Sequence, residues 1–202
     1  MKKFYFDIET LPAEVDKHEI LKKIYEKKKE KNSKFTKTLE EYIEETNFGG
    51  VFGRIFCICY AIDDEKVESI SGDEKEMLEK FWKIVLDVDK FVGHNILDFD
   101  LKFIMQRSII LKVKPSRGIS FRKYTNSDVY DIMHEWTIWG RDGIAMDALA
   151  HAMGIPSSKD GGIDGSQVHE FYKAGKGQEI IDYCSRDVEV TRAIYKRMNF
   201  EE

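Results

Sequence analysis

Two carboxylates, Asp7 and Glu9, stand two residues apart in the segment FDIET near the start of the chain. Residues 2–8 alternate weakly and are rich in Phe, Tyr and Ile, which predicts a β-strand. Side chains two apart on a strand point to one face. Acids on one face of an apolar strand are costly to bury unless a cation lies beside them. The pair is therefore either a solvated strand end or one side of a metal site.

A second candidate pair, Tyr183 and Asp187, stands four residues apart in YCSRD, on a helix predicted over residues 177–198. Positions i and i+4 of a helix are neighbours on one face. Apolar residues lie close to that face: Ile180, Ile181, Cys184 and Val188. The face is expected to be partly buried, so its aspartate is either a metal ligand or one carboxylate of an ordinary amphipathic helix.

The third candidate segment, GHNILDFD, lies where a short strand predicted over 90–93 passes into a helix predicted over 98–109. Asp98 and Asp100 fall in the first turn of that helix, where free N–H groups and the helix dipole stabilise negative charge. The simpler interpretation is that both carboxylates cap the helix, and the alternative is that one of them is directed toward a metal.

Asn95, Phe99 and Asp100 form the pattern N-x-x-x-F-D, and this pattern, not an energetic argument, favours Asp100 as the acid on the metal side. Taken together, F-D-I-E-T, H-N-x-x-x-F-D and Y-x-x-x-D resemble the three motifs of the DEDD exonuclease superfamily, tyrosine subclass (DEDDy). The wording is most similar to stand-alone relatives of the family-B DNA polymerase proofreading exonuclease domain. The similarity extends to GRIFCICYAI, MDALAHAMGI and DGSQVHEFYKAG, and it leaves out residues 13–48 and about 111–126.

The resemblance implies an α/β ribonuclease-H-like fold and a metal-dependent 3′→5′ exonuclease. The expected substrate is the 3′ end of single-stranded nucleic acid, DNA before RNA, and the expected cofactors are two divalent ions, Mg²⁺ or Mn²⁺. Carried onto matching positions, Asp7, Glu9 and Asp187 would hold the first ion. Asp7 would also bind the second, which Asp100 would reach directly or through water. Tyr183 would orient the attacking water.

The same resemblance predicts substrate contacts at two places in the chain. Asn95 and Phe99 would touch the terminal nucleotide, with core packing as the alternative for Phe99. Thr10 and Leu11 would lie against its sugar and base. His94 is interpreted as a hydrogen-bonded structural histidine, with contact to a substrate phosphate as the alternative.

General chemistry supports the same arrangement independently. Two divalent ions about 3.5–4 Å apart can activate a water and stabilise the leaving 3′ oxygen in an in-line displacement. The pKa of tyrosine is ordinarily about 10, so Tyr183 is a poor base at neutral pH and is expected to aim the water by a hydrogen bond. In the sister subclass a histidine takes this place, but His169 is too far from Asp187 in sequence to share its helical turn.

Composition places limits on the class of protein. A chain of 202 residues is expected to form one domain, 1–202, and its net charge of −5 gives no overall basic field. Basic residues cluster at 22–31 and 112–123, where they could follow a phosphate backbone. The first cluster also carries Glu26 and Glu30, so a solvated helix face explains it at least as well.

Three cysteines, Cys57, Cys59 and Cys184, are an odd number without disulfide spacing, which indicates a reducing compartment. Cys57 and Cys59 alternate on a predicted strand and are expected to pack in the core instead of binding a metal. The start MKKFYFDIET is not a signal peptide, because acids interrupt its apolar run. No stretch approaches the roughly 20 apolar residues of a membrane helix. A cytoplasmic protein without membrane contact is expected.

The elements that must position these residues follow from hydrophobic periodicity. Strands are predicted at residues 2–8, 54–62, 66–71, 90–93 and 128–132. Helices are predicted at residues 73–86, 98–109, 146–153, in a short segment capped by Ser166, and at 177–198. Residues 14–47, rich in Lys and Glu, predict two amphipathic helices, or one helix and a mobile connection, inserted between the first two strands. The pattern favours an α/β fold in which helices flank a mixed sheet.

Two polar segments are predicted to be loops. Residues 111–127 are interpreted as an exposed loop, and KDGGIDG, residues 159–165, as a flexible loop beside the substrate with Lys159 on a phosphate. This second loop is not a calcium-binding EF-hand, because Gly162 stands where an oxygen ligand is needed. Trp136 and Trp139 are expected in the core or against a partner. Four acids have no motif: Asp128, Asp131, Asp142 and Asp147.

Two alternative functions stay open at this point. The first is an exonuclease that trims RNA 3′ ends on the same scaffold, because no residue here discriminates the sugar. The second is a catalytically silent nucleic-acid-binding or scaffold module, although all four acids and Tyr183 are present. The insertion at 14–47 could clamp substrate, dimerise or cap the sheet edge. The oligomeric state is not predicted, and a proofreading role would need a separate partner.

Overall fold

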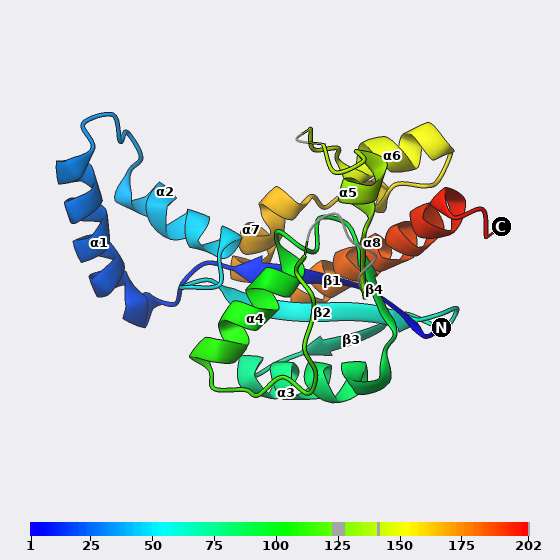
Figure 1. The fold of residues 1–202 in the computed structure, drawn as a ribbon. Helices are drawn as coiled ribbons and strands as arrows, with labels where there is room; N and C mark the ends of the chain where they lie inside the picture. Colours follow the sequence, from blue (N-terminus) through cyan, green and yellow to red (C-terminus); the bar gives the residue numbers. More distant parts are fainter. Residues whose placement is uncertain (123–127, 141, 202) are drawn as a thin grey trace.

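A computed structural model describes residues 1–122, 128–140 and 142–201 of the chain. A five-stranded sheet lies at its centre, with strand order β3-β2-β1-β4-β5 (Figure 1). The strands are β1 (Lys3–Leu11), β2 (Arg54–Ile62), β3 (Glu68–Ser71), β4 (Lys90–Gly93) and β5 (Val129–Asp131). β1 runs antiparallel to β2 and parallel to β4, so the sheet is mixed as expected.

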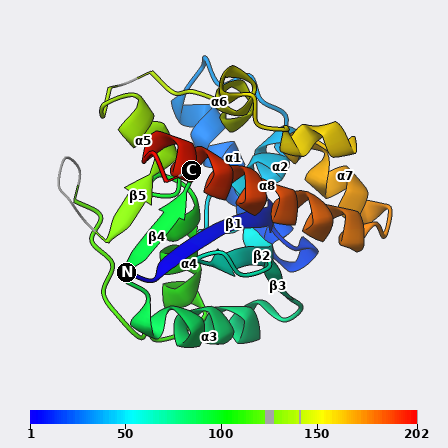
Figure 2. The ribbon, with the colours of Figure 1, turned by 90° about the vertical axis from the view of Figure 1, so that its right-hand side faces the viewer.

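Helices cover both faces of the sheet, so the predicted α/β architecture is confirmed (Figure 2). They are α1 (His18–Lys31), α2 (Leu39–Glu44), α3 (Glu74–Ile84), α4 (Asp100–Ile110), α5 (Ile132–Trp136), α6 (Met146–Met153), α7 (Val168–Lys173) and α8 (Gly177–Met198). The helices α3 and α4 lie on one face, and α8 crosses the other beside α6. Among the described residues, none of the helices is long and apolar enough to cross a membrane.

The strand β1 divides its side chains between these two layers. Phe4 and Phe6 are fully buried in the cluster that α3 and α4 complete. Tyr5 points the other way, into the cluster built with α8, and Leu11 packs with residues of α7 and α8. This period of two puts the odd-numbered residues of β1, Asp7 and Glu9 included, on the α8 face. The prediction that Asp7 and Glu9 share one face of the strand is therefore confirmed.

The predicted insertion forms a two-helix arm, residues 14–48, which projects from the carboxyl end of β1 (Figure 1). The helix α2 begins with a capping box, in which Thr38 and Glu41 bond to each other's backbone N–H groups. The rings of Tyr25, Phe35 and Tyr42 pack against one another with centroids 5.7–6.1 Å apart. The arm therefore has a small core of its own.

Several predicted boundaries were wrong for local reasons. The first strand continues to Leu11, because β2 pairs with it over that length. The helix predicted from residue 98 begins at Asp100, since Phe99 is still outside helical geometry. The strand predicted over 128–132 ends at Asp131, whose carboxylate caps α5. The helix α5 itself was not predicted, because five residues are too few for a clear helical period.

The loops differ from expectation in detail. Asp164, not Ser166, makes the capping box after the glycine-rich segment. The segment predicted as the exposed loop 111–127 buries Val113 to 6% exposure, and its last five residues lie outside the described part of the chain. The indole of Trp139 stacks on His134 and packs on the core, whereas Trp136 is 46% exposed.

Candidate metal centre

Asp7 and Glu9 stand on β1 where its pairing changes. Glu9 lies opposite Cys57, but Thr10 lies opposite Ile55, so β2 has one unmatched residue, Phe56, and forms a β-bulge. A bulge bends the strand and increases its local twist, and bulges often lie beside functional sites because they redirect side chains. The bulge here follows the second of the two acids directly, at the point where the chain leaves the sheet toward the arm.

The long helix α8 brings the third carboxylate to the same place. Asp187 is 4% exposed and Tyr183 is 6% exposed, one helical turn apart on the face that α8 turns to β1. One carboxylate oxygen from each of Asp7, Glu9 and Asp187 can be chosen so that all three lie within 4.8 Å of one another. Residues separated by nearly the whole length of the chain therefore form one compact oxygen cluster.

Asp100 approaches from the opposite layer. The strand β4 pairs with β1 only as far as Tyr5, so the backbone N–H of Ile8 lies beyond that pairing. The Asp100 carboxylate accepts a hydrogen bond from this N–H at 3.0 Å and is 3% exposed. Asp100 is not one of the three residues whose oxygens lie within 4.8 Å, but its charge raises the pKa values of Asp7 and Glu9.

The cluster is electrostatically strained without a cation. Burial raises the pKa of Asp7 well above its usual range, and the neighbouring Asp100 and Asp187 raise it further. Burial raises the pKa of Glu9 in the same way, followed by the charge of Asp187. Burial also raises the pKa of Asp100 to about 7, against the hydrogen bond from Ile8. Ionised carboxylates at this spacing need positive charge among them.

Asp187 carries the clearest sign of a missing partner. Burial raises its pKa to about 6, while hydrogen bonds from Ser158 and Tyr183 lower it. Its Oδ1 atom is buried and has no hydrogen-bond partner among the residues that the structure describes. Buried polar atoms are almost always satisfied, so an orphaned carboxylate oxygen that faces two further carboxylates fits a metal ligand. Hard oxygen donors of this kind suit Mg²⁺ or Mn²⁺.

The hydroxyl of Tyr183 lies within this cluster. Burial raises the pKa of Tyr183, and the charges of Asp187, Glu9 and Asp7 raise it further. The phenol therefore stays protonated at neutral pH and acts as a hydrogen-bond donor, not as a base. It bonds to Asp187, and a Cβ placed on Gly165 would lie 3.8 Å from its oxygen, so the glycine-rich segment passes close to the site.

The loop between β4 and α4 is held by Asp131, which sequence reasoning left without a role. Its fully buried carboxylate accepts hydrogen bonds from the backbone of Asn95 at 3.0 Å and of Leu97 at 2.9 Å. It also accepts from the backbone of Met133 and His134 at the start of α5. One side chain thus fixes the loop that leads to Asp100. The available sequence signal was an acid directly before a short helix, which is a capping position.

Two residues show how tightly this loop is bent. Asn95 has a φ of 60°, in the left-handed region that asparagine tolerates better than most residues. A Cβ on Gly93 would lie only 2.1 Å from the Ile96 side chain, so only glycine fits at the end of β4. The pattern G-H-N in the sequence therefore reports a sharp exit from the sheet as well as a motif.

The residues predicted to contact substrate differ in their exposure and in their hydrogen bonds. His94 bonds to the Ile144 carbonyl at 2.9 Å, and burial lowers its pKa, which fits the structural role expected for it. Phe99 is partly buried against the core beside Phe103. The Thr10 hydroxyl donates to the Asn47 carbonyl at 2.8 Å. The Leu11 side chain is fully buried, so only its backbone could meet a nucleotide.

A cluster of three thiols lies directly beside the carboxylates. Cys57 and Cys59 are fully buried, as expected of core residues, and the third cysteine, Cys184, joins them from α8. Their sulfur atoms lie within 4.8 Å of one another. The Cys184 thiol contacts the Asp7 carboxylate at 3.5 Å, and burial raises the pKa of this thiol well above its usual range. The Cys184 thiol therefore stays protonated and donates toward Asp7, whereas hydrogen bonds from Cys184 and Cys57 lower the pKa of Cys59 to about 4.

Cationic side chains border the site on the side of the glycine-rich segment. Arg186 donates to the Ser158 carbonyl at 3.0 Å, and Lys159 forms an ion pair with Asp164 at 2.8 Å. Both cations lower the pKa of Asp187. The predicted loop is thus partly ordered, with a short helical turn at Ser158–Gly161, and Lys159 stands near the carboxylates.

Comparison with known proteins identifies the family and the fold. Residues 51–202 match the sequence model of a family described as predicted 3′-5′ exonucleases related to the exonuclease domain of PolB. The solved structure of the family B DNA polymerase from the hyperthermophilic archaeon Pyrobaculum calidifontis is similar over 98% of this chain, with a TM-score of 0.68 and 15% sequence identity. The chain spans 24% of that polymerase chain. A search among proteins with curated descriptions found no match.

The structural likeness confirms the predicted fold, an α/β ribonuclease-H-like domain of the PolB exonuclease type. At 15% identity it carries no information about substrate. The family match begins after the first strand and the arm, so Asp7 and Glu9 lie outside it and Asp100, Tyr183 and Asp187 lie within it. The arrangement of the first two acids therefore comes from the geometry of β1 alone.

Proposed function

Because this chain belongs to the family of predicted 3′-5′ exonucleases related to the exonuclease domain of PolB, we propose that it removes nucleotides from the 3′ end of single-stranded nucleic acid. DNA is the proposed substrate, and RNA is the alternative. One observation carries the proposal: Asp7, Glu9 and Asp187 bring oxygen atoms within 4.8 Å of one another beside Tyr183. Such a cluster is what hydrolysis of a phosphodiester with divalent ions requires.

The carboxylates are proposed to hold two divalent ions, Mg²⁺ or Mn²⁺. Asp7, Glu9 and Asp187 would bind the first ion, for which the unpartnered Asp187 Oδ1 is available. Asp7 would also contact the second, with Asp100 reaching it directly or through water. When bound, the ions would lower the pKa of a water so that its deprotonated form can attack the phosphorus. They would also neutralise the charge that develops on the leaving 3′ oxygen.

Tyr183 is proposed to position the attacking water. A phenol whose pKa is raised by burial and by neighbouring carboxylates keeps its proton and can only donate one hydrogen bond at a time. In the metal-free cluster that bond goes to Asp187. Donation to a water would fix the direction of attack, which is worth far more than weak general-base catalysis by a neutral phenol.

The neighbouring residues are proposed to receive the terminal nucleotide. The loop held by Asp131 carries Asn95 and Phe99, and the end of β1, which lies opposite the bulge of β2, carries Thr10 and the backbone of Leu11. Lys159 stands beside the carboxylates and would contact a phosphate. The side chain of Phe99 is only partly buried, and its exposed part would contact a base.

The direct test is trimming of end-labelled oligonucleotides. The protein should shorten a DNA strand from its 3′ end when Mg²⁺ or Mn²⁺ is present and stop when a chelator is added. Parallel reactions on matched RNA distinguish the two substrates. Asp7→Ala should abolish trimming, whereas Asp182→Asn, which alters an exposed carboxylate next to Tyr183, should retain it. Full activity of Asp7→Ala would refute the assignment of the site.

A catalytically silent module is excluded or supported by a separate measurement. Calorimetric titration with Mn²⁺ should show binding to the natural protein and weaker binding to Asp187→Asn. A ligand that binds only the folded state also raises the melting temperature. Absence of both heat and thermal stabilisation would favour the silent module.

A further inference from the structure

The arm, residues 14–48, has a charge distribution unlike that of the rest of the molecule. Residues 17–37 contain nine lysines and three glutamates, a local net charge of +6 in a chain whose net charge is −5. We propose that the arm binds the nucleic-acid strand that leads to the 3′ end. This proposal rests on the function proposed above. The arm would hold phosphates with lysines and a base with exposed aromatic side chains.

The lysines of α1 are arranged in rows. Lys23, Lys27 and Lys31 are exposed and follow one another at intervals of four residues, so they lie on one flank of the helix at a spacing of about 6 Å. The exposed acids Glu26 and Glu30 occupy a different stripe. Like charges four residues apart destabilise an isolated helix. A row of this kind is explained better by an extended polyanion that runs beside it than by helix stability.

The base of the arm is fixed next to the candidate metal centre. The Asn47 carbonyl accepts the hydroxyl hydrogen of Thr10, the residue that follows Glu9, at 2.8 Å. The Thr46 hydroxyl accepts the backbone N–H of Ala13 at 2.8 Å. A strand that leaves the carboxylates along the end of β1 therefore meets the arm at once, with no intervening element to cross.

A third contact ties the arm to the opposite side of the site. Glu44 hydrogen-bonds to His169 and forms an ion pair, at 3.2 Å, with Lys173, both on α7. Hydrogen bonds from these two residues lower the pKa of Glu44. The arm is thus anchored on β1 and on α7 together. Since α1 has 14 residues, it is about 20 Å long and spreads its lysines over that length.

Exposed aromatic and apolar side chains lie between the lysines and the site. Phe48 is 71% exposed and is adjacent to Asn47, and Val51 is 62% exposed. An exposed aromatic ring beside a basic surface is the combination by which single-stranded nucleic acid is bound without sequence preference. Phe48 is therefore placed to stack on a base one or a few nucleotides before the 3′ terminus.

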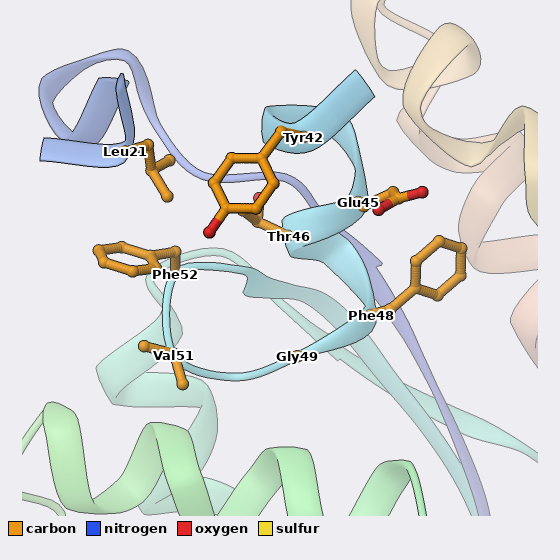
Figure 3. Close-up of a pocket in the computed structure, with 8 residues that line it drawn as sticks. All are labelled: Leu21, Tyr42, Glu45, Thr46, Phe48, Gly49, Val51 and Phe52. Atoms are coloured by element: carbon orange, nitrogen blue, oxygen red, sulfur yellow. The ribbon is translucent and has the colours of Figure 1, made fainter. Parts of the chain in front are cut away.

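A hollow of about 290 Å³ opens at the base of the arm (Figure 3). Figure 3 shows Leu21, Tyr42 and Phe52 facing one another around it, with Phe48 at the edge of the group, away from Leu21. The volume is at the lower end for small-ligand pockets, which suits one flat ring and not a larger ligand. The wall is formed largely by apolar side chains and aromatic rings, which suit the flat face of a base.

The test compares charge removal on the arm with equal charge removal elsewhere. The arm variant carries Lys23→Gln, Lys27→Gln and Lys31→Gln. The matched control, called the α3 control, carries the same change at three exposed lysines away from the arm: Lys80 and Lys83 of α3, and Lys66 between β2 and β3. Both variants lose three positive charges, and both leave the carboxylates untouched. Binding of a fluorescent single strand in the absence of metal is measured against salt concentration.

Loss of three phosphate contacts predicts a specific change in salt dependence. The slope of log affinity against log salt should become about 2 less negative in the arm variant. The natural protein should accordingly lose about 20-fold more affinity than the arm variant between about 50 and 200 mM salt. The α3 control should keep the natural slope. Equal slopes for the arm variant and the natural protein would overturn the proposal.

Substrate length separates this proposal from the proposed function. Hydrolysis of a small chromogenic phosphodiester of thymidine needs the carboxylates but does not reach the arm. The arm variant should hydrolyse it at the natural rate and trim a long oligonucleotide with a raised KM. If no substrate is hydrolysed by any form, the proposed function fails, while the metal-free binding measurement still decides the role of the arm.

Substitutions of Phe48 provide a second, independent test of the proposal. Phe48→Leu keeps an apolar side chain but removes the stacking surface, and it should weaken binding of the strand about tenfold. Phe48→Tyr keeps the ring and should bind normally. If both variants bind normally and the natural protein is a dimer that Phe48→Leu dissociates, the surface belongs to a second copy of the chain and the proposal is wrong.

Discussion

The two faces of β1 carry side chains of opposite chemistry. On one face, Phe4 and Phe6 are fully buried among aromatic rings of α3 and β4. On the other, the partly buried Asp7 and the buried Glu9 lie beside a third carboxylate, and desolvation raises the pKa of each. One face gains free energy from apolar burial, and the other stores electrostatic strain that a cation can relieve. A strand can therefore support the fold and hold a site because successive side chains alternate.

The sharpest way to break this comparison is to neutralise Asp7. Asp7→Asn removes a buried like charge, so the metal-free protein should become more stable, while trimming should fall by at least about 10³-fold, as for the loss of a strong transition-state interaction. Thermal unfolding in chelator and single-turnover trimming with Mn²⁺ measure the two effects. Opposite signs for stability and activity are expected, and a loss of both would contradict the account.

The matching change on the other face is Phe6→Ala. Truncation of a fully buried phenylalanine should lower the free energy of unfolding by about 3–5 kcal/mol. Urea unfolding measures this loss. At a temperature where the variant stays folded, Mn²⁺ binding should be retained, because no carboxylate is altered. Abolished Mn²⁺ binding by the folded variant would show that the two faces are not separable.

Asp131 is a buried acid of a third kind, because its carboxylate accepts hydrogen bonds from four backbone N–H groups. Asp131→Asn leaves some of these donors unpaired and should lower stability by about 1–3 kcal/mol. It should also slow trimming roughly tenfold, because the loop that carries Asn95 and Asp100 loses its support. Asp87→Asn is the control, since its side chain is 72% exposed and its ion pair with Lys2 contributes little to stability. Equal effects of the two changes would remove the positioning role.

The smallest expected effect is a dependence of stability on pH. Burial raises the pKa of Asp100 to about 7, so in the folded state its neutral form is favoured. The stabilising contribution of that proton is complete below the ordinary value of about 4 and is lost as pH rises through about 7. In chelator, Asp100→Asn should gain melting temperature over the natural protein as pH rises through this range. A constant difference would contradict the raised pKa.

The sequence identified the face of β1 and the helical pair on α8 because periods of two and four residues are local properties. It could not place Cys184 beside Cys57 and Cys59, since that contact depends on how α8 crosses the sheet. Asp131 was missed for a similar reason: its partners are backbone groups, which leave no pattern of side-chain types. The side chain of Leu11 was expected near substrate, but the β-bulge after Glu9 precedes its burial against α7 and α8.

The arm also shows what could not be predicted from the sequence. Its two helices could be predicted from the spacing of apolar residues in 14–47, but the sequence left three roles open for it. Only the contacts of Asn47 and Glu44 with β1 and α7 place it beside the candidate metal centre. The position of the arm relative to the carboxylates therefore could not be predicted from any local sequence pattern.

One measurement tests the central claim most directly, namely that the carboxylates of both ends of the chain form a site for divalent ions. A crystal soaked in Mn²⁺ should give anomalous density among Asp7, Glu9 and Asp187, with a second peak between Asp7 and Asp100. Crystals of Asp187→Asn should lose or weaken the first peak. Absence of any anomalous density at this cluster in the natural protein, at a Mn²⁺ concentration that supports trimming, would contradict the account.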